Sequence, residues 1–133
     1  MILVDSSAWV EYDRATGSAV DLRLTSLVVS DIPVVAVTEP VIAEVCMGAR
    51  SDERESDLRR FLGRFHLLPF EAAKDFDPAV RIYRTCRRAG VSPRGLIDCM
   101  IAAVALRHDA SLLAQDADIQ RIADVMALRL DAY

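Results

Sequence analysis

The sequence predicts a three-layer α/β domain built on a central parallel sheet of four to five strands. Short apolar runs such as Ile2–Val4 and Val34–Val37 indicate buried strands, and each precedes a segment whose apolar residues recur at helical spacing. Strands that are apolar throughout and alternate with helices are typical of parallel sheets covered by helices on both faces. The 133 residues contain no repeat and no Pro/Gly-rich linker, which predicts one domain over residues 1–133.

Helices are expected where a capping residue precedes apolar residues at helical spacing. The expected capping residues of the first four helices are Ser6 or Ser7, Ser18, Thr38 and Ser51. Glu39 and Pro40 suit the first turn of the third helix, and Gly48 suits its end. These signals predict helices after the first strand, over 18–28, over 38–48 and from residue 51 onward.

The second half of the chain continues the alternation of strands and helices. Residues 66–70 predict a weaker strand, and Pro69 places it at an edge of the sheet because proline lacks the N–H of a central strand. A long helix is expected to end at Ala89, before Gly90. A largely apolar helix over 95–108, a strand over 111–114, a short helix over 119–125 and a fifth strand over 128–130 complete the prediction.

No apolar run approaches the roughly 18 residues that a membrane span requires. The first residues lack the basic start and long apolar stretch of a signal peptide, so we expect a cytoplasmic protein without membrane contact. The three cysteines are odd in number and lack C-x-x-C spacing, which supports neither a disulfide framework nor a zinc site.

The charges are unusual in kind rather than in total. Fourteen of the 20 acids are aspartate, 15 of the 16 bases are arginine, and the net charge is −4. Nucleic-acid binding depends on accumulated Lys and Arg, so the total by itself argues mildly against a nucleic-acid partner.

Five acids stand out by their position. Asp5 follows the first predicted strand, and Asp116 and Asp118 follow the fourth, at the strand ends where parallel sheets form their sites. Glu44 and Asp98 are each the only charge in an apolar helical stretch. A carboxylate in such a setting costs several kcal/mol unless it is paired or binds a metal.

Each of these acids also has an ordinary structural interpretation. Asp5 could cap a helix, Asp116 and Asp118 could form a turn, and Glu44 could pair with an arginine. Four converging carboxylates, however, would repel one another without a cation, and oxygen ligands without a supporting His or Cys suit Mg²⁺ or Mn²⁺. The predicted chemistry is attack of a metal-activated water on a phosphodiester.

Four motifs occur in order along the chain. They are Val4-Asp5-Ser6-Ser7-Ala8-Trp9, Glu44 within an apolar helix, Leu96-Ile97-Asp98 followed by Ile101-Ala102-Ala103, and Ala114-Gln115-Asp116-Ala117-Asp118. Together they resemble the acidic motifs of PIN-domain ribonucleases, and within that superfamily the chain is most similar to the VapC toxins of toxin–antitoxin pairs. The resemblance covers essentially the whole chain.

This resemblance implies a PIN-like fold and Mg²⁺- or Mn²⁺-dependent endonucleolytic cleavage of RNA, often tRNA or rRNA. It also implies a homodimer and a cognate VapB-like antitoxin that blocks the site, with DNA contacted only through the antitoxin. At matching positions, the catalytic and metal-binding acids are Asp5, Glu44, Asp98 and Asp116. Asp118 matches a position where a further acidic ligand is frequent. Ser7 matches a small polar position that supports the site by hydrogen bonds. Gly95 departs from the Ser or Thr usual in relatives, which removes a hydroxyl near the metal.

The segment between Ala79 and Ile97 carries arginines and no acids. They are Arg81, Arg84, Arg87, Arg88 and Arg94, and the rest of the chain has eleven bases against twenty acids, or −9. A solvated helix face is the ordinary interpretation, yet no acid at i,i+4 pairs with these arginines inside the segment. We therefore expect Arg87, Arg88 and Arg94 to contact RNA phosphates.

Three other functions fit parts of this pattern. A phosphatase with an aspartyl nucleophile would carry a second Asp two residues after the first, where this chain has Ser7. A receiver-type regulatory module would carry a Lys near its last strand, but the only lysine is Lys74. A catalytically idle PIN-like binding module remains the third alternative, against which the full set of acids argues.

Overall fold

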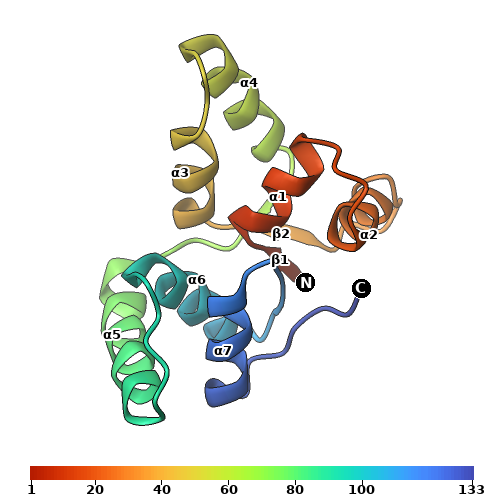
Figure 1. Cartoon of the computed structure of the whole chain (residues 1–133). Coiled ribbons are helices and arrows are strands. Elements are labelled where there is room, and N and C mark those ends of the chain that lie inside the picture. The colour runs from red at the N-terminus through yellow and green to blue at the C-terminus, as the bar shows by residue number, and fades with distance from the viewer.

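The computed structural model describes all 133 residues as four parallel strands and seven helices. The strands are β1 (Ile2–Val4), β2 (Val35–Val37), β3 (His66–Leu67) and β4 (Ser111–Leu113). The helices are α1 (Ser6–Asp13), α2 (Ala19–Val28), α3 (Glu39–Met47), α4 (Asp52–Leu62), α5 (Ala72–Arg88), α6 (Leu96–Arg107) and α7 (Ala117–Met126). The strand order is β3-β2-β1-β4, which confirms the predicted α/β class and parallel sheet. Figure 1 shows the helices arranged around β1 and β2.

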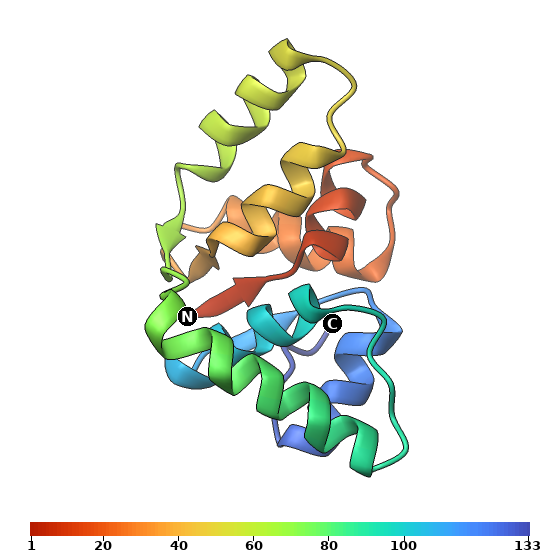
Figure 2. The ribbon, with the colours of Figure 1, turned by 90° about the vertical axis from the view of Figure 1, so that its left-hand side faces the viewer.

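Helices cover both faces of this sheet. Figure 2 shows α1 to α4 on one side of β1 and α5 to α7 on the other. The central strand β1 pairs with β2 through Leu3 opposite Ala36 and with β4 through Leu3 opposite Leu112. All three side chains are fully buried, because β1 and its neighbours lie between two helical layers. The predicted three-layer arrangement is therefore confirmed.

The start of α1 differs from the prediction. Asp5, rather than Ser6 or Ser7, is the N-cap, which confirms the structural interpretation given above for Asp5, and its carboxylate accepts a hydrogen bond from the Ser7 N–H. The helix begins directly after β1 at Ser6, so the strand-end acid occupies the capping position. Ser18 and Ser51 cap α2 and α4 as predicted.

The weak strands are shorter than predicted. β3 spans only His66–Leu67, although it does lie at the sheet edge. Its pairing ends before Pro69, and the Phe70 N–H donates to the Glu39 carboxylate at 2.8 Å instead of extending the sheet. The expected strand over 128–130 contributes a single bridge between Leu112 and Leu130, so the sheet has four strands.

An aromatic cluster attaches α4 to the rest of the molecule. Trp9 of α1 contacts Phe61 and Phe65 with ring centroids 5.7 and 5.1 Å apart, and Tyr12 stacks on Phe61 at 5.7 Å. Burial of these rings compensates for the polar composition of α4. None of the seven helices combines the length and the apolar character needed to cross a membrane.

Candidate functional site

The candidate site lies where the chain order reverses in the sheet. From β1, the chain continues to β2 on one side and returns later to β4 on the other, so the carboxyl ends of β1 and β4 border one crevice. Asp5 immediately follows β1, and its N–H donates to the Leu113 carbonyl at the end of β4 at 2.8 Å. Asp116 follows β4 and caps α7. The topology therefore brings together acids that are more than 100 residues apart.

Asp5 is a buried carboxylate with one oxygen held by the protein and one left free. Its side chain accepts hydrogen bonds at Oδ2 from the Ser7 N–H at 3.0 Å and the Ser7 hydroxyl at 2.5 Å. Its Oδ1 is buried without any hydrogen-bond partner. Burial raises the pKa of Asp5, the Ser7 hydrogen bonds oppose this rise, and the charges of Glu44 and Asp116 add to it. A buried oxygen without a partner is costly, so its position calls for a ligand.

Ser7 also links the two strand ends. Its hydroxyl oxygen accepts a hydrogen bond from the Gln115 N–H at 2.9 Å, and the hydroxyl also donates a hydrogen bond to the Asp5 carboxylate. The same side chain thus fixes the Asp5 carboxylate and the chain that leaves β4 toward Asp116.

Glu44 and Asp98 approach Asp5 from two helices. Glu44 lies on α3, and its Oε1 accepts a hydrogen bond from the Ser6 hydroxyl at 2.6 Å. Asp98 lies in the first turn of α6. Burial raises the pKa of Asp98 to about 7, and the negative charges of Asp5, Asp116 and Glu44 contribute in that order. A bound cation would therefore stabilise the ionised form of Asp98.

The acids form two groups that share Asp98. One ligand oxygen each from Asp5, Glu44 and Asp98 lies within 4.8 Å of the others, and the same holds for Asp98, Asp116 and Asp118. Every donor is a carboxylate oxygen, the ligand type of Mg²⁺ and Mn²⁺. The free Asp5 oxygen and the raised pKa of Asp98 agree with this donor chemistry, so these residues fit a divalent cation.

The second group already contains cations from the protein. The buried Asp118 carboxylate accepts from Arg94 Nε at 2.8 Å and from Arg121 Nη1 at 3.0 Å. The hydrogen bond from Arg94 is the largest cause of a lowered pKa of Asp118. Asp116 uses Oδ1 to cap α7 through the Asp118 N–H at 2.7 Å, and its Oδ2 lies 3.7 Å from Arg94 Nη2. The charge of Asp118 is therefore balanced within the chain, in contrast to the charges of Asp5, Glu44 and Asp98.

The structure separates the three arginines that the sequence grouped together. Arg94 forms an ion pair with Asp118, a member of the second acidic group. Arg87 and Arg88 are in the last turn of α5, where they border a hollow together with Arg84. Only Arg94 is thus next to the acids.

Two residues that contact the site acids were not predicted from the sequence to belong to the site. Arg121 is three residues after Asp118 on α7, a helical spacing at which an ion pair is foreseeable. Ser6 contacts Glu44 across 38 residues, and no local pattern signals such a contact.

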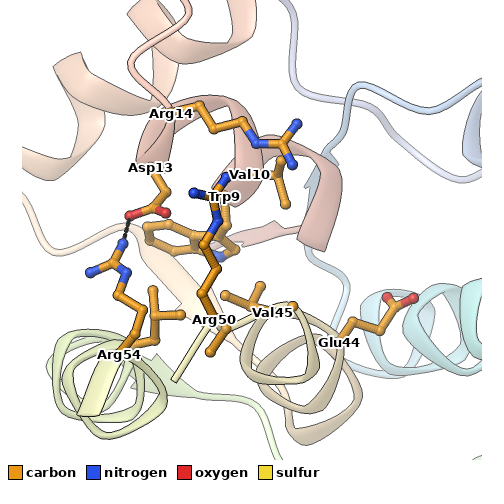
Figure 3. Close-up of a pocket in the computed structure, with 11 residues that line it drawn as sticks. Trp9, Val10, Asp13, Arg14, Glu44, Val45, Arg50 and Arg54 are labelled. Carbon is orange, nitrogen blue, oxygen red and sulfur yellow. Dashed lines mark hydrogen bonds and ion pairs between the residues drawn. The ribbon is translucent and has the colours of Figure 1, made fainter. Parts of the chain in front are cut away.

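A pocket of about 500 Å³ adjoins the acidic groups on the α3 side. Figure 3 shows Glu44 at its edge and Trp9, Val10 and Val45 among its lining residues. Arginine side chains from α1, α4 and the loop after α3 surround it, and only Arg54 is ion-paired, with Asp13. The Trp9 indole N–H is buried and has no hydrogen-bond acceptor.

Comparisons with known proteins agree with this architecture. The family model described as PIN domain matches residues 2–125. The chain is 40% identical to Ribonuclease VapC11 of Mycobacterium tuberculosis over 133 residues, which cover 100% of this chain and 99% of that protein.

Solved structures resemble it over similar lengths. VapBC2 from Rickettsia felis, bound to a DNA fragment from its promoter, gives a TM-score of 0.76 at 20% identity and covers 100% of this chain and 99% of that chain. VapC20 of Mycobacterium tuberculosis, described as a sarcin-ricin loop cleaving toxin, gives a TM-score of 0.65 at 19% identity. The match covers 90% of this chain and 93% of that chain. At these identities the structural likeness concerns the fold alone.

Proposed function

Because the chain belongs to the PIN-domain family, we propose that it is a metal-dependent endoribonuclease and the toxin of a VapBC-type toxin–antitoxin pair. Its 40% identity to Ribonuclease VapC11 along the whole chain supports this activity. The observation that carries the proposal is the close approach of Asp5, Glu44 and Asp98, of which Asp5 has a buried carboxylate oxygen without a hydrogen-bond partner. We expect tRNA or rRNA as the substrate.

We propose Asp5, Glu44, Asp98 and Asp116 as the residues that hold the cation, with Mg²⁺ as the ion and Mn²⁺ as its substitute. Asp118 is the weaker ligand, because Arg94 and Arg121 already use both of its oxygens. When bound, such an ion lowers the pKa of an attacking water and stabilises charge that develops on the phosphodiester oxygens.

The protein's own groups hold this site in position. Ser7 orients the Asp5 carboxylate, and Ser6 orients Glu44 through its hydroxyl. Arg94 keeps Asp118 ionised and reduces the repulsion that Asp116 and Asp118 exert on an incoming phosphate. The site therefore has its ligands positioned before any substrate arrives, which reduces reorganisation during the reaction.

The family membership also supports a partner. Structures with the same fold include a VapBC complex, so we propose a VapB-like antitoxin for this chain, together with a homodimer, a single domain over residues 1–133 and a cytoplasmic location. The pocket beside Glu44 is lined by apolar residues such as Trp9, Val10 and Val45 and also by Arg14 and Arg50, which form no ion pair. A partner segment that carries both apolar side chains and carboxylates would complement this lining.

RNA cleavage by the purified protein tests the proposed activity. With Mg²⁺ or Mn²⁺ we expect cleavage of tRNA or rRNA, its loss in EDTA, and a reduction of more than about 100-fold in Asp98→Asn and Asp5→Asn, since even outer-shell changes at metal sites cost 10- to 100-fold. Asp57→Asn is the matched control, because Asp57 is an exposed acid of α4 paired only with Arg60. The Asp98→Asn and Asp5→Asn variants should also bind Mn²⁺ more weakly than the parent, as measured by calorimetry. A parent protein that neither cleaves any of these RNAs nor binds Mn²⁺ contradicts the proposal.

A further inference from the structure

We propose that Arg84, Arg87 and Arg88 form a subsite for the RNA phosphate backbone, separate from the acidic groups that hold the scissile bond. The identity of the ligand rests on the proposed ribonuclease function. The subsite itself rests on three observations: the shape of this surface, the absence of acidic partners, and its position along the chain.

The three arginines border one open hollow. Arg84, Arg87 and Arg88 are exposed on the last two turns of α5 and are the only residues that line a depression of about 340 Å³. The opposite face of the helix is anchored in the core by the buried Ile82 and Cys86. A rigid helix therefore presents three guanidinium groups to the same volume of solvent.

No carboxylate neutralises this group. Eight of the 15 arginines in the chain are in ion pairs, and Arg84, Arg87 and Arg88 are not among them. The only side-chain hydrogen bond that they make runs from Arg88 Nη2 to the Thr85 hydroxyl at 3.1 Å. Most of their donors thus remain free for an external anion.

Helix stability does not account for the cluster. Arg84 lies three residues before Arg87 and four residues before Arg88. At these spacings the positive charge of Arg84 repels that of each of the other two on the helix surface. The negative end of the helix dipole favours Arg87 and Arg88, which are in the last turn, but Arg84 precedes that turn. An anion in the hollow would relieve the repulsion among all three.

The hollow lies at one end of a segment whose other end is the acidic site. Residues 89–95 connect α5 to α6, and Figure 2 shows this loop returning from the end of α5 toward the start of α6. The path from Arg88 to Leu96 spans at most about 30 Å. A stacked strand rises about 3.4 Å per nucleotide, so about nine nucleotides or fewer bridge the two places.

Guanidinium groups suit phosphate because their planar fork donates two hydrogen bonds to one phosphate group. A strand of about nine nucleotides cleaved at the acidic site is therefore long enough for its flanking phosphates to reach the hollow. Such contacts depend on the backbone and carry no base specificity.

RNA binding without metal tests this subsite independently of cleavage. The probe is a fluorescein-labelled 20-nucleotide single-stranded RNA in EDTA, with anisotropy measured over a series of salt concentrations. For Arg84→Gln/Arg87→Gln/Arg88→Gln we expect about tenfold or greater loss of affinity. The slope of log affinity against log salt should also fall by about 2 in magnitude, or roughly 0.7 for each lost phosphate contact. The control is Arg59→Gln/Arg60→Gln/Arg64→Gln, which removes three exposed charges in and beside α4, on the other side of the sheet.

Three results overturn the proposal: unchanged affinity in the α5 variant, equal weakening in both triple variants, or no RNA binding by the parent at 50 mM salt. Circular dichroism melts establish that both variants are folded. Weakened binding by the α5 variant together with a parent that cleaves no RNA would retain the subsite and contradict only the nuclease proposal.

Discussion

Asp98 is a residue whose ionisation is opposed by its surroundings. It belongs to both acidic groups, and burial together with four neighbouring carboxylates raises its pKa to about 7. In the protein without metal, ionisation of Asp98 is therefore opposed by desolvation and repulsion, and the carboxyl is partly protonated near pH 7. A bound cation removes both costs, which links metal binding to folding stability.

This cost predicts a pH-dependent effect of Asp98→Asn on stability. In the unfolded chain Asp98 titrates near 3.8, and in the folded protein near 7, so the folded state binds the extra proton in between. The stability of the parent should therefore decrease as pH rises from about 4 to about 7, and Asn should remove that decrease. In EDTA at pH 8 we expect the variant to be more stable by roughly 1–3 kcal/mol. This is less than the ~4 kcal/mol of three pKa units because water screens a partly exposed group.

Urea unfolding at pH 4.5 and pH 8 measures this difference. The gain should be large at pH 8 and small at pH 4.5, and Asp57→Asn should show no such dependence. If Asp98→Asn raises the free energy of unfolding equally at both pH values, the stabilisation does not come from the removal of Asp98 ionisation.

At the scale of elements, one buried ion pair holds α5 against α6. Asp75 of α5 is fully buried and receives two hydrogen bonds of 2.8 Å from Arg107 of α6, whose guanidinium also donates to the Pro69 carbonyl. Burial raises the pKa of Asp75, but the hydrogen bonds from Arg107 and the Glu71 N–H outweigh it, so the pKa is lowered overall. This pair positions α5, which carries the arginine hollow, relative to α6, which carries Asp98.

Breaking this pair should destabilise the whole protein. Asp75→Asn leaves the Arg107 charge without its partner, and because Arg107 is partly exposed we expect a loss of about 1.5–3 kcal/mol in the free energy of unfolding at pH 7. Because the pKa of Asp75 is lowered, the pair stabilises the protein above about pH 4 and loses this effect as pH falls further. The difference between parent and variant should therefore shrink toward pH 3. Urea denaturation followed by circular dichroism checks both points, and a loss below 1 kcal/mol at pH 7 would contradict the importance of the pair.

At the scale of the whole molecule, one continuous core joins the two helical layers. Thirty-two buried apolar residues form a single cluster that includes Trp9 on one side of the sheet and Ile122 on the other. Neither layer can bury its apolar face without the sheet, so we expect the proposed single domain to unfold cooperatively.

Trp9, the only tryptophan, makes this testable. Its fluorescence reports on α1 and α4, whereas the ellipticity at 222 nm reports on all seven helices. We expect the two signals to give the same urea midpoint within error. An earlier fluorescence transition would show that α1 to α4 separate from α5 to α7 and would contradict a single cooperative domain.

The local signals in the sequence predicted most of the fold. Apolar runs placed β1, β2 and β4 within one residue of their observed ends, because a parallel strand buried on both faces has no polar positions. The caps Ser18 and Ser51 were also predicted correctly, because a capping residue acts on the helix that directly follows it. The errors fell where neighbouring segments compete: Asp5 replaced Ser6 or Ser7 as a cap, and residues 128–130 make one bridge instead of a strand.

By itself, the sequence determined the fold class and the acids that follow the strands, since both depend on residue types within one element or its immediate end. The tertiary structure alone decided which side chains meet: Arg94 with Asp118 across 24 residues, and Ser6 with Glu44 across 38. It also placed Arg84 beside Arg87 and Arg88 in a common hollow. Contacts between elements depend on how the helices pack on the sheet, and no periodicity along the chain encodes that packing.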